Sequence, residues 1–294
     1  MGHLSRIRSG TIFGLYLLAS IGGGIGVSGA QEAIITYRPP PEAAENHVYP
    51  QRLLAEALNR TADRYGDVRI TQAFATVSRD RSKVLLEEGR YLHVMAEVPR
   101  PNWENDLIPI YIPLRKGLQG YRLFFINREL QPLMDKVETL DDLRRFSTGS
   151  GAQWSTTLIL ENAGFDVVTG HDYETMFDMF SLRRFQTFSR GINEIFFELD
   201  TMSDKYPDMY IETGLALHVP LPVYFFVTPT KPKLAERIEL GLREMIADGS
   251  FDKLFMEYHG DLIRRANLAN RKIFRLENPN LSNRVPLENP DLWY

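Results

Sequence analysis

Apolar strand-like runs alternate along the chain with segments of helical periodicity. Three runs in the first third have strand character: residues 33–37 (AIITY), 68–74 (VRITQAF) and 91–98 (YLHVMAEV). Between them, Leu53, Leu54 and Leu58 belong to a helical pattern over 49–64. Ser78 is the expected N-cap of a further helix ending at Gly89. This alternation predicts an α/β fold with ligand-facing loops at the carboxyl ends of its strands.

A second α/β half lies between two strongly apolar runs, 120–126 (GYRLFFI) and 222–229 (PVYFFVTP). Because these runs bracket the second half, we infer that they cross between two lobes in opposite directions and form a two-strand hinge beside a central cleft. After the second crossing, a helical face is interrupted at Asp248-Gly249 and followed by a second short helix. The predicted organisation is a leader (1–30), a first lobe in two parts (31–119 and 228–269), a second lobe with the hinge strands (120–227), and an extended C-terminal tail (270–294).

The N-terminus has the layout of a secretory signal peptide. Arg6 and Arg8 precede an apolar run, and Ser28 and Ala30 provide small side chains before a cut at Gln31. The alternative, a membrane anchor, calls for about 20 continuous apolar residues, and this run is shorter and rich in Gly. We therefore expect export, with no membrane insertion after the leader is removed.

The charge and the cysteine count exclude several function classes. Without the two leader arginines, 32 basic residues stand against 38 acidic ones, a net charge of −6, and the basic residues are scattered, which argues against nucleic acid. The absence of cysteine excludes disulfides, thiolate metal sites and cysteine nucleophiles. The six histidines are dispersed, so neither a local metal motif nor a cofactor is expected.

Residues 234–260 (LAERIELGLREMIADGSFDKLFMEYHG) resemble the end of the bacterial periplasmic solute-binding proteins of family 3, the amino-acid type with the type II periplasmic-binding-protein fold. The order of parts extends the resemblance over Ile34 to Gly260, and the segments GYRLFFI, ILENAG, RGINEI and PVYFFV indicate a divergent branch. The resemblance implies a periplasmic, monomeric protein without enzymatic activity. Such a protein captures a small polar or anionic organic solute for an inner-membrane ABC-type permease or a membrane sensor.

The resemblance also indicates where the sequence departs from amino-acid binders. Those proteins hold the ligand carboxylate with an Arg after the third strand and the ammonium with an Asp in the second lobe. Arg100 is a loose match to the first, whereas Gln186 stands where the Asp is expected. A neutral amide cannot balance a buried ammonium, which argues against free α-amino acids.

The candidate ligand-binding residues are polar or aromatic and lie where cleft loops are expected. Arg100 can pair with an anionic group that Trp103 covers, and backbone N–H groups near Ser150 and Gly151 suit an anion if a helix begins there. The full set is Tyr37, Arg38, Arg100, Trp103, Ser150, Gly151, Trp154, Arg190, Asn193 and Glu194. The alternatives are structural roles: a solvated Arg100, Ser150 as an ordinary N-cap, Trp154 packed beneath its loop, and a surface turn at 190–194.

The rival function class is an exported enzyme on the same fold, such as a dehydratase-like lyase. Its general acid or base would be a cleft carboxylate with a raised pKa, and Glu194 or Glu97 could serve. The sequence has no nucleophile elbow, phosphate loop or metal pair.

Overall fold

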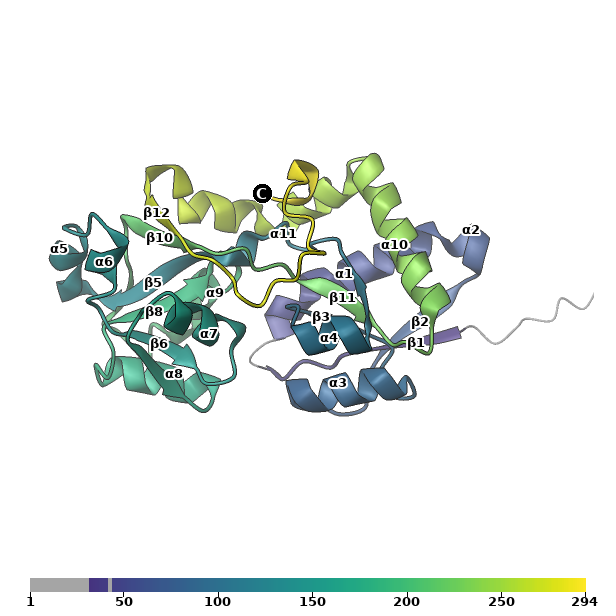
Figure 1. The fold of residues 1–294 in the computed structure, drawn as a ribbon, viewed down its shortest axis with the longest axis horizontal. Coiled ribbons are helices and arrows are strands. Elements are labelled where there is room, and N and C mark those ends of the chain that lie inside the picture. The colour runs from purple at the N-terminus through teal and green to yellow at the C-terminus, as the bar shows by residue number, and fades with distance from the viewer. Residues whose placement is uncertain (1–31, 42–43) are drawn as a thin grey trace, which may run out of the picture. The chain divides into compact units, whose positions relative to one another are not determined.

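The computed structural model describes residues 32–41 and 44–294, so the predicted leader lies outside the described residues. The described chain has two β-sheets, each flanked by helices (Figure 1). We call the part built on the first sheet the first lobe and the part built on the second sheet the second lobe. Over the described ranges, no helix has both the length and the apolar character needed to cross a bilayer.

The first sheet has the strand order β2-β1-β3-β11-β4. Its strands are β1 (Glu32–Thr36), β2 (Val68–Gln72), β3 (Val94–Glu97), β4 (Ile108–Ile110) and β11 (Tyr224–Val227). β1 pairs in parallel with β2 and β3, whereas β11 is antiparallel to both β3 and β4. The three strands predicted in the first third are therefore confirmed, and they point their carboxyl ends to one edge of this sheet.

The second sheet has the order β12-β10-β5-β8-β6-β7, and β9 also pairs with β5. Its strands are β5 (Tyr121–Asn127), β6 (Thr148–Gly151), β7 (Val167–Gly170), β8 (Thr187–Gly191), β9 (Met209–Ile211), β10 (Leu215–His218) and β12 (Lys272–Arg275). β6 is parallel to β7 and β8, and β5 is antiparallel to β8. Strands β6 and β8 thus end at the same edge.

The helices cover these sheets. In the first lobe they are α1 (Ala44–Arg60), α2 (Ala62–Tyr65), α3 (Arg79–Glu88), α4 (Pro101–Asp106) and α10 (Pro232–Ala247). In the second lobe they are α5 (Gln131–Met134), α6 (Leu140–Leu143), α7 (Ser155–Asn162), α8 (Tyr173–Ser181) and α9 (Ile192–Met202). The last helix, α11 (Ser250–Ala266), contacts α1 and α10 of the first lobe and α9 of the second.

Helix ends agree with the sequence chemistry at two predicted places and differ at a third. Ser78 caps α3 by accepting a hydrogen bond from the Arg81 N–H, and Gly89 ends that helix in the left-handed conformation at φ 63°. α1 begins at Ala44, five residues before the predicted start, and contains Pro50. A proline inside a helix lacks the N–H that would bond to the carbonyl four residues earlier. The helix continues through this gap because its buried face packs on α10.

The hinge consists of two crossing segments, 111–120 and 219–223, that precede β5 and β11. The Leu114 N–H donates to the Val223 carbonyl (2.9 Å), and the Val219 N–H donates to the Gly120 carbonyl (3.0 Å). A Cβ at Gly120 would lie 2.0 Å from the Val219 oxygen, so only glycine permits this approach. The sequence predicts two crossings between the lobes, and the structure has two. The apolar runs that were expected to form them are instead the sheet strands β5 and β11, which follow directly after the crossing segments.

The C-terminal residues 270–294 are not extended throughout. Lys272–Arg275 forms β12, which pairs in parallel with β10 at the edge of the second sheet. The chain then passes to the first lobe (Figure 1). There Val285 packs in an apolar cluster with Trp103 and Phe226. At the terminus, the Tyr294 N–H donates to the Lys116 carbonyl on the hinge (2.8 Å).

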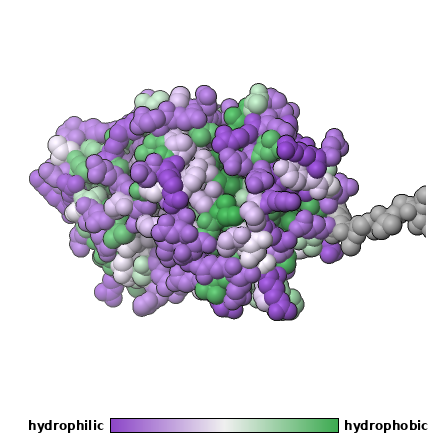
Figure 2. Space-filling view, turned by 45° about the vertical axis from the view of Figure 1, so that its right-hand side comes forward, coloured by the Kyte–Doolittle hydropathy of each residue, from purple (hydrophilic) through white to green (hydrophobic). Residues whose placement is uncertain are grey.

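One face of the molecule is mainly polar. Figure 2 shows one face on which hydrophilic residues predominate and apolar residues occur in small groups. This agrees with a chain of net charge −4.

Candidate functional site

A cavity of about 360 Å³ lies between the two lobes. Its lining comes from the carboxyl edge of the first sheet, the hinge, and the N-terminal turns of α7 and α9. The lining residues are Pro40, Asn46, His47, Pro50, Arg79, Ala96, Glu97, Val98, Arg115, Gln119, Arg122, Trp154, Ser155, Thr156, Tyr173, Arg190, Asn193, Glu194, Leu221 and Val223. A site of this size accommodates a small organic molecule.

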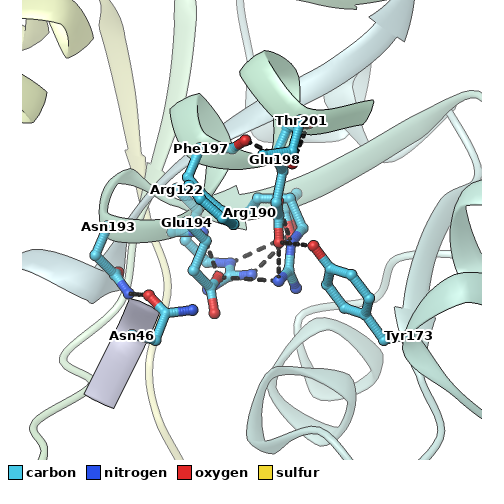
Figure 3. A network of polar contacts seen from close by, with 11 residues as sticks. Asn46, Arg122, Tyr173, Arg190, Asn193, Glu194, Phe197, Glu198 and Thr201 are labelled. Atoms are coloured by element: carbon cyan, nitrogen blue, oxygen red, sulfur yellow. Dashed lines mark hydrogen bonds and ion pairs between the residues drawn. The ribbon is translucent and has the colours of Figure 1, made fainter. Parts of the chain in front are cut away.

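The second-lobe wall is built around Arg190, near the end of β8. Its Nε and Nη2 donate to the Glu198 carboxylate at 2.9 and 2.5 Å, and the Tyr173 hydroxyl donates to the same carboxylate at 3.1 Å (Figure 3). The guanidinium lies 4.4 Å from the centre of the Trp154 ring. Burial opposes the charge of Arg190, but Glu194 and Glu198 outweigh it and raise its pKa. Charge-assisted hydrogen bonds and ring contacts thus connect Trp154, Tyr173, Arg190 and Glu198, which we call the second-lobe frame.

Glu194 is held in the first turn of α9 by the backbone. The Gly191 N–H donates to its Oε2 (3.0 Å), and the Arg190 Nη2 lies 3.4 Å from the same oxygen. Burial alone would raise the pKa of Glu194, yet the charges of Arg190 and Arg122 outweigh it, so the pKa is lowered. The carboxylate therefore remains ionised at neutral pH.

Two further arginines come from the first hinge segment and from the strand that follows it. Arg115, on the first crossing segment, donates from Nη2 to the Asn46 carbonyl. That carbonyl is available because Pro50, four residues later in α1, has no N–H to occupy it. Arg122, in β5, donates from Nη2 to the Ser189 carbonyl (2.7 Å), and burial lowers its pKa to about 10.

The first-lobe wall carries one ion pair and a neutral histidine. Arg79, the first residue of α3, donates from Nε to the Glu97 carboxylate at the end of β3 (2.9 Å). Burial, followed by the charge of Arg115, lowers the pKa of His47 to about 4. His47 is therefore uncharged at neutral pH and presents a polar ring without adding positive charge.

Hydrogen bonds cross the mouth of the cavity from one lobe to the other. The Gln153 carbonyl of the second lobe accepts from Arg100 Nη2 (3.1 Å) and Arg79 Nη1 (3.5 Å) of the first. The Asn193 Nδ2 of the second lobe donates to the Asn46 Oδ1 (3.3 Å) (Figure 3). Hydrogen bonds thus connect the two lobes directly at this mouth.

Four of the ten candidate residues line the cavity: Trp154, Arg190, Asn193 and Glu194. Arg100 lies at the mouth, where it contacts the Gln153 carbonyl. Trp154 combines the two roles considered from sequence, because it stacks on Phe188 (6.0 Å between ring centres) and also faces the cavity.

The other five candidates do not line this cavity. Trp103 is fully buried against Phe226 in the first lobe, so it cannot cover a ligand group held by Arg100. Tyr37 and Arg38 follow β1 as expected but bond to the carbonyls of Val77 (3.5 Å) and Ala73 (2.6 Å), fixing the loop after β2.

Ser150 and Gly151 lie in strand β6 and not at a helix start. The Ser150 hydroxyl is buried against that of Thr157 (2.7 Å), and a Cβ at Gly151 would meet the Trp154 ring. The helix begins at Ser155, so Ser155 and Thr156 face the cavity in their place.

Sequence reasoning did not select Arg79, Arg115, Arg122 or Tyr173. Arg122 carried a usable signal, because an arginine inside the apolar run YRLFFI must have a buried polar environment. Gln186, the residue placed at the ammonium position, bonds to the Ser147 backbone and lies away from the cavity. Among the residues described, no three His, Asp or Glu side chains gather as a metal site would require.

Comparisons with known proteins identify the fold. No protein-family model matches the chain, and no curated protein matches its sequence. Among solved structures, the chain is similar to a probable amino-acid ABC transporter extracellular-binding protein from Bacillus subtilis, at 15% identity and TM-score 0.57, over 79% of this chain and 99% of that one.

It is also similar to an arginine transport-system periplasmic binding protein from Legionella pneumophila, at 16% identity and TM-score 0.54, over 78% and 99% of the two chains. An ancestral arginine-binding protein bound to arginine is similar at 16% identity and TM-score 0.54, over 78% and 97%. These likenesses confirm the predicted two-lobed periplasmic-binding-protein fold.

Proposed function

We propose that this chain is a periplasmic solute-binding protein that encloses a small polar or anionic organic solute between its lobes. The captured solute is delivered to an inner-membrane ABC-type permease or presented to a membrane sensor. The observation that carries the proposal is the charged cavity at the junction of the two lobes, with hydrogen bonds between side chains and backbone of the two lobes at its mouth.

The binding residues we assign are the four sequence candidates that line the cavity: Trp154, Arg190, Asn193 and Glu194. We assign Arg79 and Arg100 a role in lobe closure and not in direct binding. They hold the Gln153 carbonyl across the mouth and therefore stabilise the closed form in which a solute is enclosed.

The enzyme alternative receives no support from Glu194. As a general acid or base of a lyase this carboxyl group would need a raised pKa, whereas Arg190 and Arg122 lower its pKa. The similar solved structures are binding proteins rather than enzymes.

The test is thermal melting of residues 31–294 against amino acids, opines, dicarboxylates, aromatic acids and sugars. A ligand at 100 times its dissociation constant stabilises the folded state by about 2.7 kcal/mol, which raises the melting temperature measurably. We expect Asn193→Ala to weaken binding of the best solute in calorimetry. Gln186→Ala is the matched control, since that amide lies outside the cavity.

Lobe closure is measured separately. Because the chain has no cysteine, Glu161→Cys on α7 and Lys233→Cys on α10 place one fluorophore on each lobe. A solute that binds between the lobes shifts the population toward a single short distance. A panel without any stabilising solute, or a solute that binds without changing this distance, would contradict the proposal.

A further inference from the structure

Two buried arginines, Arg115 on the hinge and Arg122 at the start of β5, form no ion pair in the part of the chain that the structure describes. Arg115 is 6% exposed and Arg122 is 4% exposed, both line the cavity, and neither forms an ion pair with any residue that the structure describes. The Arg115 Nε is buried without a hydrogen-bond partner within that same part of the chain. Glu194 compensates these two charges only from a distance. A buried guanidinium without a paired anion is costly, so an additional group that satisfies it would be strongly favoured.

A third buried arginine, Arg237, has a purely structural role and provides a comparison for Arg115. Arg237 on α10 is 4% exposed and lies away from the cavity. It donates to the carbonyls of Leu58 (2.9 Å) and Gly66 (2.8 Å) and to the Thr61 hydroxyl (3.0 Å). Arg115, by contrast, bonds to a single carbonyl. The fold thus provides three acceptors for Arg237 and one for Arg115.

The charge balance of the cavity leaves a positive excess. Four guanidinium groups line it, from Arg79, Arg115, Arg122 and Arg190. They face three carboxylates, namely Glu97 and Glu194 in the lining and Glu198 directly behind it. One positive charge therefore remains for a ligand to neutralise.

The same carboxylates are not available to a ligand cation. Glu97 is paired with Arg79, and Glu194 accepts from the Gly191 N–H beside Arg190. An ammonium group in this cavity would approach four guanidinium groups without a free counter-charge, which makes it unfavourable.

A neutral donor, however, has an acceptor. The Asn193 Oδ1 is buried and has no partner among the described residues. Asn46 connects it to the arginine, since its carbonyl accepts from Arg115 and its Oδ1 accepts from the Asn193 Nδ2. Because Asn46 contacts both residues, a carboxylate at Arg115 and a hydroxyl at Asn193 can belong to one small molecule. Val98, Leu221 and Val223 provide apolar lining for its short hydrocarbon group.

We propose that Arg115 and Arg122 form an anion subsite at the hinge end of the cavity, and that the solute is a small organic monoanion without an ammonium group, of the 2-hydroxy acid class. This inference rests on the proposed function and specifies its ligand. It differs from the sequence expectation, in which Arg100 held the anion.

The experiment uses matched series of probes that share one hydrocarbon group. 3-Phenyllactate, phenylalanine and 2-phenylethylamine form one series, and 2-hydroxyhexanoate, norleucine and pentylamine form the other. We expect the hydroxy acid of at least one series to raise the melting temperature and to bind more tightly than its amino acid or amine. Inorganic phosphate should give a smaller shift, because it leaves the apolar lining uncovered.

The variants separate binding from folding. We expect Arg115→Met and Arg122→Met each to weaken hydroxy-acid binding by roughly 30-fold or more, as truncation of a buried charge partner does. Without ligand, Arg115→Met should melt no lower than the wild type, because it removes an unsatisfied buried charge. Arg237→Met is the control, and it should melt lower while its folded fraction keeps full affinity.

The outcomes distinguish failure of the anion subsite from failure of the proposed solute-binding function. Stabilisation by the amino acid or the amine but not by the hydroxy acid, or by phosphate alone, would leave a solute-binding protein and overturn the anion subsite. Arg115→Met that melts as low as Arg237→Met would also overturn it. If no probe of either series and no member of the broader panel binds, both the subsite and the proposed function fail.

Discussion

Replacing Arg190 with methionine is the most direct way to test the second-lobe frame. The change leaves the Glu198 carboxylate, 2% exposed, without its three guanidinium hydrogen bonds. Breaking a buried ion pair from one side costs about 3–5 kcal/mol. The arginine also lies 4.4 Å from the centre of the Trp154 ring, so a cation–π contact is lost as well. For a chain of this size we expect the melting temperature to fall by about 6–20 °C.

The assay is thermal unfolding followed by circular dichroism, with the pH varied. Burial already raises the pKa of Glu198, and loss of Arg190 raises it further. A carboxyl group whose pKa is higher folded than unfolded destabilises the folded state when ionised. The deficit of Arg190→Met is therefore largest at neutral pH and shrinks as the pH falls toward the ordinary range of a glutamate.

Two comparisons make the argument refutable. Adding Glu198→Gln to Arg190→Met removes the stranded charge and keeps an acceptor for the Tyr173 hydroxyl, so the double variant should be more stable than the single one. The control Arg243→Met breaks an exposed pair with Glu239 and should cost about 0–1 kcal/mol. A loss for Arg190→Met no larger than this control, or a double variant less stable than the single one, would refute the reasoning.

Three further substitutions test the hinge, the core and a buried histidine. Gly120→Ala should lower the free energy of unfolding, measured in urea, by about 1–3 kcal/mol, because its Cβ meets the Val219 carbonyl. The control Gly260→Ala has room for a methyl group and should be neutral or stabilising. Trp103→Ala should lower the free energy of unfolding by about 3–5 kcal/mol, because this side chain is fully buried. The folded fraction should bind solute with unchanged affinity, whereas a loss of affinity would indicate that Trp103 covers the ligand. Burial, followed by the charge of Arg115, lowers the pKa of His259 to about 3. The stability of the wild type should therefore fall as the pH drops from about 6.5 toward 3. If the melting temperature of His259→Phe falls as steeply with pH as that of the wild type, the prediction is wrong.

The sequence alone determined the features that depend on local spacing. The alternation of apolar and helical segments predicted the strands of the first lobe, and Ser78 and Gly89 predicted both ends of α3. Two apolar runs predicted the hinge, although each run proved to be the strand that follows a crossing. These features were accessible because turn, cap and periodicity chemistry acts between residues close in the chain.

The polar cluster at the start of α9 was accessible for the same reason. Arg190, Asn193 and Glu194 lie within one helical turn of each other, so their grouping in the second-lobe wall follows from the sequence. The sequence also predicted a helix start facing the cleft near Gly151, but displaced by four residues, because β6 extends through that glycine.

Only the tertiary structure decided which residues face the cavity and which lack partners. Trp103 and Arg100 are three residues apart, yet one lies in the core and the other at the mouth, because Phe226 and Val285 arrive from distant parts of the chain. Whether Arg115 is satisfied depends on a carbonyl that Pro50 leaves open in α1. Burial and hydrogen-bond completion are sums over neighbours far apart in sequence, and they exist only once the lobes have packed.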